Sequence, residues 1–230
     1  RDKARQAVRE SLVLLKNRNN ILPINEKVSK IVVVGEHANS TGLQSGGWTI
    51  NWQGTTESYQ GGTTILEGIK KRSKGNVVYD KDASANHFDA DLAIIVVGEN
   101  PYAEFFGDIG HETNTLTLSL TKEHKNYIHT YSNKGVKTVV VLISGRPLVV
   151  SHQIKKSDAF IAAWLPGSEG DGIAEVLFGD YNFSGKLPHS WPKNKKDYKG
   201  KYGPNFWDST ITPLYPLGYG LTYKKAQSRN

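Results

Sequence analysis

Short, continuous apolar runs recur along the chain and predict strands that are covered on both faces. The runs are Lys30–Gly35 (KIVVVG), Leu92–Gly98 (LAIIVVG), Thr138–Ile143 (TVVVLI), Ala159–Trp164 (AFIAAW) and a shorter one at Val77–Tyr79. A strand with one exposed face would alternate apolar and polar residues, whereas these runs are continuously apolar after a polar first residue at Lys30 and Thr138. The pattern therefore indicates a parallel sheet that is buried between two layers.

Helical patterns fill the gaps between these runs. Two of them begin with threonines suited to capping a helix, and others place their apolar side chains near one face. The expected helices are Ala4–Lys16, Thr64–Arg72, Thr121–Lys134 and Ile173–Phe178. Alternating strands and helices predict an α/β fold, a mostly parallel open sheet with helices on both faces. Because we find no internal repeat and no linker, we expect residues 1–230 to form a single domain.

Composition excludes several classes of protein. The 230 residues contain no Cys, which excludes a disulfide framework, a zinc ribbon, an iron–sulfur protein and a thiol nucleophile. The longest apolar runs are too short to cross a bilayer, so we expect no membrane partner. The chain also contains no Met. We therefore expect it to be a piece of a longer protein.

The chain is basic, with 29 Lys and Arg against 22 Asp and Glu and a formal net charge of +7. Five lysines fall within residues 193–201 (KNKKDYKGK), which is typical of a solvated loop. No zinc-finger spacing and no RNA-binding aromatic motif accompanies them. We therefore expect no nucleic-acid partner.

Ligands of open α/β sheets bind beyond the carboxyl ends of the strands. Four loops leave the predicted strands at this edge: residues 35–54, 98–108, 144–147 and 166–172. They contain no dinucleotide-binding GxGxxG, no phosphate-binding P-loop and no GxSxG nucleophile motif. The seven His residues have no metal-ligand spacing. The sequence therefore predicts neither a cofactor nor a metal.

Two tryptophans and three carboxylates remain as candidate site residues. Trp48 and Trp52 lie four positions apart in a loop of Gly and polar residues, where indole rings could stack on sugar rings. Burial in the core is the alternative for this pair. Glu99, Glu104 and Asp108 follow the strand at 92–98, and spacing alone assigns no role to any of them. Glycoside hydrolysis needs two carboxyl groups that flank the scissile bond, and these loops offer one half of such a pair.

The same motifs resemble a known family. IVVVGEHA, QSGGWTINWQG, GTTILEGI, VVGENPYAE, VLISGRPLVV, AAWLPGSEGDGIAEVLFGDYNFSGKLPHSWP and YPLGYGLTY occur in one order along the chain. In that order they resemble the second, α/β sandwich domain of glycoside hydrolase family 3, in particular plant-type and bacterial β-glucosidases and exo-β-glucanases. The resemblance runs essentially from end to end.

The resemblance implies a role for each candidate. Glu104 matches the second Glu of the family motif GE-x-P-Y-x-E-x-x-G-D and would be the general acid/base of a retaining hydrolase, while Glu99 would support its loop. Trp48 and Trp52 would line the aglycone side of the cleft, and Arg146 would tie loops together. The family's nucleophilic Asp belongs to an N-terminal (β/α)8 barrel that these 230 residues do not include. The implied partners are that barrel, as a domain or a separate chain, and a β-glucoside or β-glucan oligosaccharide, with no cofactor.

Three alternatives stand beside this interpretation. The chain could be a non-catalytic carbohydrate-binding module that keeps the Trp pair, although a retained Glu104 argues against pure binding. It could be a structural α/β domain without a chemical role, or part of a β-xylosidase of the same family. A polymeric substrate would imply a secreted or periplasmic protein.

Overall fold

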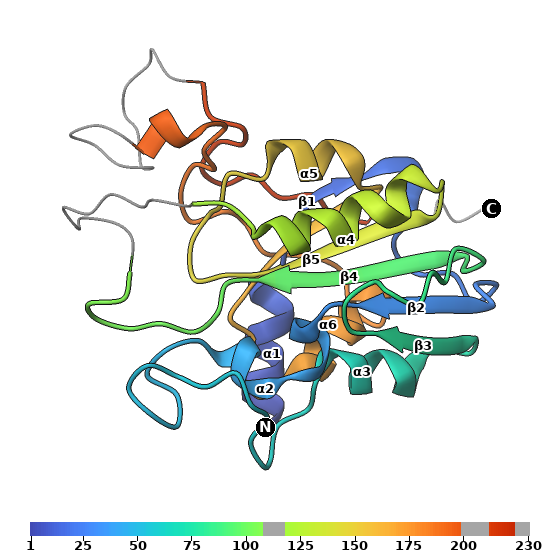
Figure 1. Ribbon diagram of the computed structural model, residues 1–230, viewed down its shortest axis with the longest axis horizontal. Helices are drawn as coiled ribbons and strands as arrows, with labels where there is room; N and C mark the ends of the chain where they lie inside the picture. Colours follow the sequence, from blue (N-terminus) through green and yellow to red (C-terminus); the bar gives the residue numbers. More distant parts are fainter. Residues whose placement is uncertain (108–117, 199–211, 224–230) are drawn as a thin grey trace, which may run out of the picture.

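The computed structural model describes residues 1–107, 118–198 and 212–223 (Figure 1). Within these residues one sheet of six strands has the order β1-β6-β5-β4-β2-β3. All neighbouring strands run parallel except β1, which pairs antiparallel with β6. The strands are β1 (Val13–Asn17), β2 (Lys30–Val34), β3 (Asn76–Asp80), β4 (Leu92–Gly98), β5 (Lys137–Ile143) and β6 (Ala159–Trp164). The predicted mostly parallel α/β sheet is confirmed.

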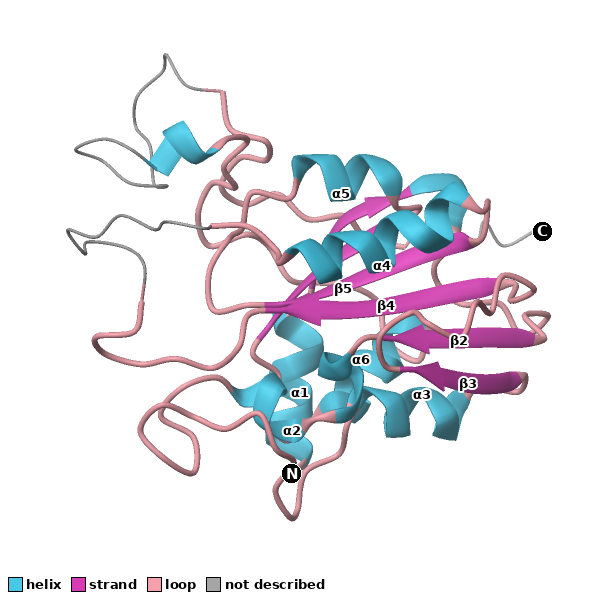
Figure 2. Ribbon diagram, viewed as in Figure 1, coloured by secondary structure: helices cyan, strands magenta, loops and turns pink. Residues whose placement is uncertain are grey.

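Helices cover both faces of the sheet (Figure 2). One layer contains α1 (Asp2–Ser11), α3 (Ile65–Arg72) and α6 (Gly170–Leu177), and the other contains α4 (Lys122–Asn133) and α5 (Ser151–Lys156). Along β2, Ile31 and Val33 belong to the first hydrophobic cluster, and Val32 and Val34 belong to the second. Successive strand side chains point to opposite faces, so both faces of β2 are buried. This double burial is the physical reason for the continuous apolar runs.

The expected helix starts at residues 64 and 121 are also confirmed. The Thr64 hydroxyl accepts a hydrogen bond from the backbone N–H of Glu67, and the Glu67 carboxylate accepts one from the backbone N–H of Thr64. This reciprocal capping box satisfies two N–H groups that would otherwise lack partners. Thr121 caps α4 by accepting from the backbone N–H of His124 at 3.1 Å.

The helix expected over Ala4–Lys16 is wrong in its second half. The helix α1 ends at Ser11, and Val13–Asn17 form the edge strand β1. The four successive side chains from Leu12 to Leu15 are at most 1% exposed. Leu14 packs into one hydrophobic cluster while Val13 and Leu15 pack into the other. An amphipathic helix buries a single face, so this run requires a strand between two layers.

The chain extends the sheet in one direction from β2 to β3 and in the opposite direction from β4 onwards, so the strand order switches between β2 and β4. The chain places β3 outside β2, and it places β5 and β6 on the far side of β4. In open α/β sheets the ligand crevice forms at such a switch point, beyond the carboxyl ends of the strands. The loops that follow β2 and β4 leave the sheet at the same edge (Figure 1). The topology therefore brings the two loops that carry the candidate residues together.

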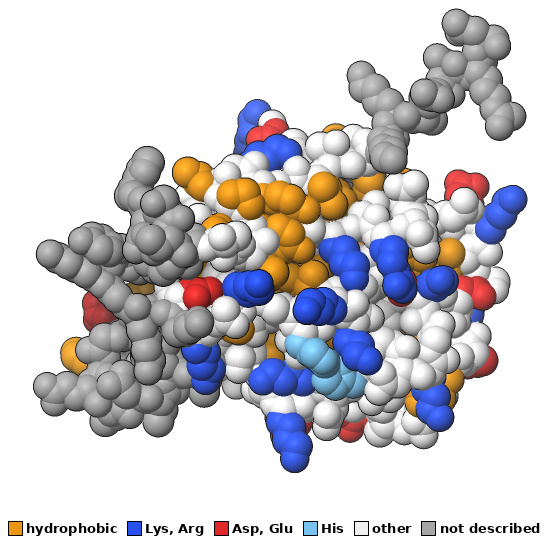
Figure 3. Space-filling model, turned by 90° about the horizontal axis from the view of Figure 1, so that it is seen from above, with side chains coloured by type: hydrophobic (Ala, Val, Ile, Leu, Met, Phe, Trp, Pro, Cys, Tyr) orange, Lys and Arg blue, Asp and Glu red, His pale blue; other side chains and the backbone are white. Residues whose placement is uncertain are grey.

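Part of the basic excess lies over the layer of α4 and α5. Figure 3 shows Lys and Arg side chains gathered over the middle of the molecule as seen from above. In the lysine-rich segment, a short 3-10 helix, η3, covers Lys195–Tyr198, whereas Lys199 and Lys201 lie outside the described residues. None of the described helices has the length and apolar character needed to cross a membrane.

Candidate active site

The loop after β2 presents Trp48 and Trp52 at the surface. Their side chains are 67% and 42% exposed, whereas Trp191 in the core is fully buried. The backbone N–H of Trp48 donates to the carbonyl of Trp52 at 3.0 Å, and the ring centroids lie 6.3 Å apart. The alternative that the pair fills the core is therefore wrong. The two indoles form an exposed aromatic pair at the crevice edge of the sheet.

Gln53 joins this aromatic loop to the loop that carries Glu104. Its amide nitrogen donates to the backbone carbonyl of Glu104 at 3.2 Å, and its amide oxygen accepts from the backbone N–H of Ala103 at 2.8 Å. The Phe105 ring lies edge-on to Trp52, with centroids 6.0 Å apart. Glu104 itself is exposed. Sequence reasoning did not single out Gln53 or Phe105, because their importance depends on contacts between two separate loops.

The two loops approach closely enough to require glycine. A Cβ atom on Gly47 would lie 2.2 Å from the carbonyl oxygen of Tyr102, and one on Gly54 would lie 2.6 Å from Cβ of Pro101. A side chain at either position would push the loops apart. The glycines therefore permit the backbone packing that sets the distance between the Trp pair and Glu104.

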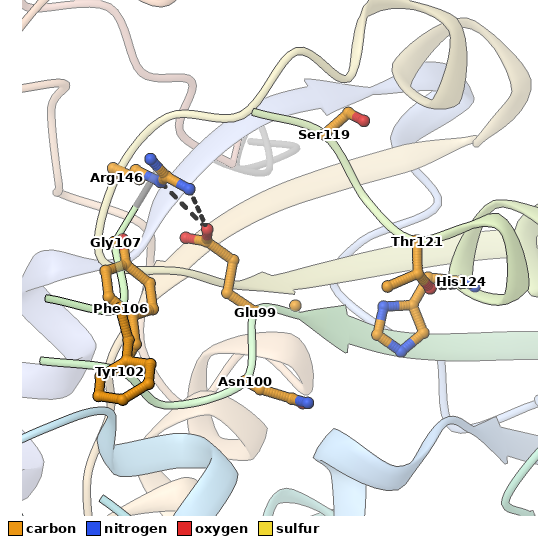
Figure 4. Close-up of a pocket in the computed structure, with 10 residues that line it drawn as sticks. Glu99, Asn100, Tyr102, Phe106, Gly107, Ser119, Thr121, His124 and Arg146 are labelled. Atoms are coloured by element: carbon orange, nitrogen blue, oxygen red, sulfur yellow. Dashed lines mark hydrogen bonds and ion pairs between the residues drawn. The ribbon is translucent and has the colours of Figure 1, made fainter. Parts of the chain in front are cut away.

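Glu99 forms an ion pair with Arg146 at the base of the second loop. Nε and Nη2 of Arg146 donate to Oε1 of Glu99 at 3.0 and 2.7 Å, and both side chains are largely buried (Figure 4). The Arg146 guanidinium also lies 5.6 Å from the ring centroid of Tyr102. The pair ties the loop after β4 to the loop after β5, as the resemblance implies for these two residues. Asp108 lies outside the described residues.

A cavity of about 270 Å³ opens beside this ion pair. Glu99 and Arg146 line one side, and Thr121 and His124 from the start of α4 line the other (Figure 4). The side chain of Asn100 lies between them. Tyr102 and Phe106, from the loop that carries Glu104, also line the cavity, so its lining combines charged and aromatic side chains.

Behind the cavity, Glu36 lies against two histidines. Its Oε1 atom is 2.7 Å from Nε2 of His124 and 3.6 Å from Nδ1 of His37. Burial opposes ionisation of Glu36, but the hydrogen bond with His124 and the nearby imidazole of His37 outweigh it and hold the pKa of this carboxyl far below its usual value. Glu36 and His124 are 88 positions apart in the sequence. This explains why a search for metal-ligand spacing does not find the cluster.

Comparison with known proteins identifies the family. Residues 12–223 match the glycosyl hydrolase family 3 C-terminal domain. A lysosomal beta glucosidase of Dictyostelium discoideum is 31% identical over 97% of this chain, which spans 29% of that protein. A periplasmic beta-glucosidase of Salmonella typhimurium is also 31% identical over 97% of this chain, which spans 35% of it. The chain thus spans about a third of the length of these curated relatives.

A solved structure supports the same assignment. The exo-1,3/1,4-beta-glucanase ExoP from a Pseudoalteromonas species superposes with a TM-score of 0.82 and is 39% identical. The match covers 96% of this chain and 28% of that one. The described sheet and its two helical layers are thus those of a family 3 domain. From its motifs, its fold and these matches, the chain belongs to glycosyl hydrolase family 3, within which it corresponds to the C-terminal domain.

Proposed function

We propose that this chain supplies the general acid/base and the aglycone-side aromatic residues of a retaining β-glucosidase or exo-β-glucanase. The complete enzyme would release glucose from the non-reducing ends of β-glucosides or β-glucans. An N-terminal (β/α)8 barrel, in the same protein or on a separate chain, would carry the nucleophilic Asp. The names of the relatives and their greater length support this division of labour.

Two carboxyl groups would perform the reaction in two steps. Glu104 would first protonate the glycosidic oxygen while the barrel's Asp attacks the anomeric carbon, and the aglycone would leave. Glu104 would then take a proton from the water that attacks the glycosyl-enzyme, which restores both groups. In retaining enzymes the two carboxyl groups lie about 5–5.5 Å apart. We therefore expect the barrel's Asp to face Glu104 across the domain interface.

The observation that carries the proposal is the clamp of Gln53 on both sides of the Ala103–Glu104 peptide bond. Through it, the segment with the exposed tryptophans also holds the backbone of the proposed acid/base. Catalysis needs such a fixed position, because a proton donor must lie within hydrogen-bonding reach of the leaving oxygen. A sugar stacked on Trp52 would lie beside the loop of Glu104.

The exposure of Glu104 and of the apolar side chains near it also supports a partner surface that would cover this region in the complete enzyme. Trp48, Ile50, Phe105 and Phe106 are each at least 67% exposed. Contiguous exposed apolar side chains mark interaction sites. In the proposed enzyme the barrel and the substrate would cover these side chains and would partly bury Glu104.

The proposal is tested by Glu104→Gln in protein that contains this chain together with its barrel. We expect turnover of cellobiose or laminaribiose to fall by about 10²-fold or more, since general acid–base catalysis contributes that much. An aryl glucoside with a good leaving group needs little protonation, so its burst of released phenol should persist. The exposed Glu57→Gln is the matched control and should keep full activity. Wild-type turnover of laminaribiose by the Glu104 variant would disprove the assignment.

The same preparation tests two of the alternatives, the carbohydrate-binding module and the β-xylosidase. A carbohydrate-binding module would bind laminarioligosaccharides without hydrolysing them, and Glu104→Gln would then leave their affinity unchanged. A β-xylosidase would turn over aryl xylosides faster than aryl glucosides. We expect hydrolysis and a preference for glucosides.

We also propose that the protein acts outside the cytoplasm, as a secreted or periplasmic enzyme. The relative from Salmonella typhimurium carries the word periplasmic in its name. Detection of the protein in culture medium or in an osmotic-shock fraction, with a cytoplasmic marker as control, tests this location.

A further inference from the structure

The proposed hydrolysis assigns no role to a cluster of three side chains, Glu36, His37 and His124. Glu36 and His37 follow β2 after Gly35 and begin the short 3-10 helix η2 (Glu36–Asn39). His124 lies in the first turn of α4. One ligand atom from each of the three residues falls within 4.8 Å of the others. Two imidazoles and one carboxylate are a donor set that binds zinc in enzymes.

The hydrogen bond of His37 Nε2 leaves the other ring nitrogen, Nδ1, facing the carboxylate of Glu36. Nε2 of His37 lies 3.2 Å from the backbone carbonyl of Glu99. A carbonyl only accepts, so this nitrogen carries a proton and donates it. In a neutral imidazole the other nitrogen, Nδ1, then presents its lone pair. Nδ1 of His37 is buried, has no hydrogen-bond partner among the described residues and lies 3.6 Å from Oε1 of Glu36.

Two electron-pair donors that face each other in a buried site need a positive charge between them. A second proton on His37 or a metal ion would supply it. With a metal ion, the hydrogen bond from His37 to the Glu99 carbonyl would be the outer contact that orients a metal-bound imidazole. Ligand atoms around a tetrahedral zinc ion lie about 3.3 Å apart, given bond lengths of about 2.0–2.1 Å. Oε1 of Glu36 lies 2.7 Å from Nε2 of His124 and 3.6 Å from Nδ1 of His37, one shorter and one longer than this ligand–ligand distance.

The cluster is also open on one side. Glu36 and His124 line a second cavity, of about 460 Å³, together with Asn100 and Tyr127. His124 lines the first cavity as well, across from Arg146 (Figure 4). A water molecule could therefore reach the metal and complete four-coordination, which three protein ligands leave open.

We infer that Glu36, His37 and His124 bind one divalent transition-metal ion of the zinc class through Oε1, Nδ1 and Nε2. The ion would join the end of β2 to the start of α4. Through His37 it would also hold the carbonyl of Glu99, at the start of the loop that carries Glu104. The site would act by positioning this loop, without contact to the substrate.

Zinc binding to metal-free protein tests the inference, because it needs no enzymatic activity. Protein that contains this chain is treated with a chelator, dialysed and titrated with Zn²⁺ by calorimetry. We expect one Zn²⁺ per chain and a rise in melting temperature on binding. Co²⁺ in place of Zn²⁺ should give the visible absorption bands of a four-coordinate site with nitrogen ligands.

Single-ligand variants locate the ion. Glu36→Gln and His124→Gln remove one ligand each, and we expect either change to weaken Zn²⁺ binding by at least about tenfold. Glu36 is partly exposed and His124 is buried, so circular dichroism verifies that both variants fold. If a variant fails to fold, the Co²⁺ spectrum of the wild-type protein still tests for imidazole ligands.

A second histidine pair provides the matched control. Nε2 of His129 lies 3.2 Å from Nδ1 of His152 on the exposed surface of α4 and α5. The double variant His129→Asn/His152→Asn should keep the Zn²⁺ stoichiometry and affinity. Zn²⁺ binding that survives Glu36→Gln and His124→Gln, or that is lost in this control, would overturn the inference. Absence of Zn²⁺ binding by the wild-type protein would overturn it as well.

Discussion

Gln53 holds Glu104 through the peptide backbone, with its amide nitrogen 3.2 Å from the Glu104 carbonyl oxygen. The two residues are 51 positions apart and lie on loops that follow different strands. Gln53 contacts only the main chain at Ala103 and Glu104, so this contact does not hold the exposed Glu104 side chain, which can face a partner surface. The relationship makes Gln53 a positioning residue for the proposed acid/base.

Replacing Gln53 should lower catalysis as well as stability. Gln53→Ala removes two hydrogen bonds to the backbone of Ala103 and Glu104, each worth about 1 kcal/mol. We expect kcat/KM for laminaribiose in the complete enzyme to fall by about tenfold, mostly through kcat, because the proton donor loses its fixed position. The neighbouring Asn51→Ala is the control and should be close to wild type. Unchanged kinetics in Gln53→Ala would show that the loop keeps its position without the clamp.

Adding one methyl group at Gly47 should separate the two loops. The Cβ of Gly47→Ala would meet the Tyr102 carbonyl oxygen at 2.2 Å, so a loop must move. We expect the free energy of unfolding to fall by about 1–3 kcal/mol, as in other overpacked sites. Gly145→Ala is the matched control, since its Cβ would make an ordinary 3.6 Å contact with Leu165. Urea denaturation measures both, and equal stability of the two variants would contradict the close approach.

The exposed tryptophans should matter for substrate and the buried one for stability. We expect Trp52→Ala and Trp48→Ala to change the free energy of unfolding by less than about 1 kcal/mol, because both side chains are exposed. Trp191→Ala should lower it by about 3–5 kcal/mol, since it leaves a cavity in the core.

If the proposed function holds, the same two surface variants should raise KM for a glucan oligosaccharide by about tenfold, equal to about 1.4 kcal/mol of lost binding. Initial rates at varied oligosaccharide concentration measure this effect. A KM that stays at the wild-type value in both variants would count against an aglycone role for the pair.

Acid should weaken the contact between α1 and α6. Burial opposes ionisation of Glu169, but Arg1 and Arg5 outweigh it and hold the pKa of this carboxyl below its usual range. Burial likewise opposes ionisation of Asp171, but Arg72 and Arg5 hold the pKa of that carboxyl below its usual range. A carboxyl whose pKa is lower in the folded than in the unfolded protein stabilises the fold. This stabilisation is complete at a pH above the unfolded-state pKa, about 4, and is lost as the pH falls through the folded-state pKa.

We therefore expect Arg5→Gln to destabilise the protein at pH 7 and the difference from wild type to shrink as the pH falls below about 4. Urea denaturation at a series of pH values measures this difference. Lys3→Gln, on the exposed face of the same helix, should show little difference at any pH. A difference for Arg5→Gln that is independent of pH would contradict the coupling to Glu169 and Asp171.

Local sequence determined most of the sheet. Apart from polar residues at the starts of β2 and β5, the runs at β2, β4, β5 and β6 are apolar because both of their faces are buried. A burial requirement of this kind is visible residue by residue. The threonine caps at 64 and 121 are equally local, since a cap acts within three residues. The edge strand β1 was predicted as helix because Ala4–Ser11 is amphipathic and the run Leu12–Leu15 continues it without a break.

The motif around Glu104 and the loop of Trp48 and Trp52 could also be named from the sequence, and they led to the family. Their mutual arrangement could not, because it depends on the switch in strand order between β2 and β4. That switch alone places Gln53 against Glu104, and His37 and Glu36 against His124. Side chains that are 50 or more positions apart carry no shared local pattern. Only the packing of the chain into two layers around one sheet decided that they meet.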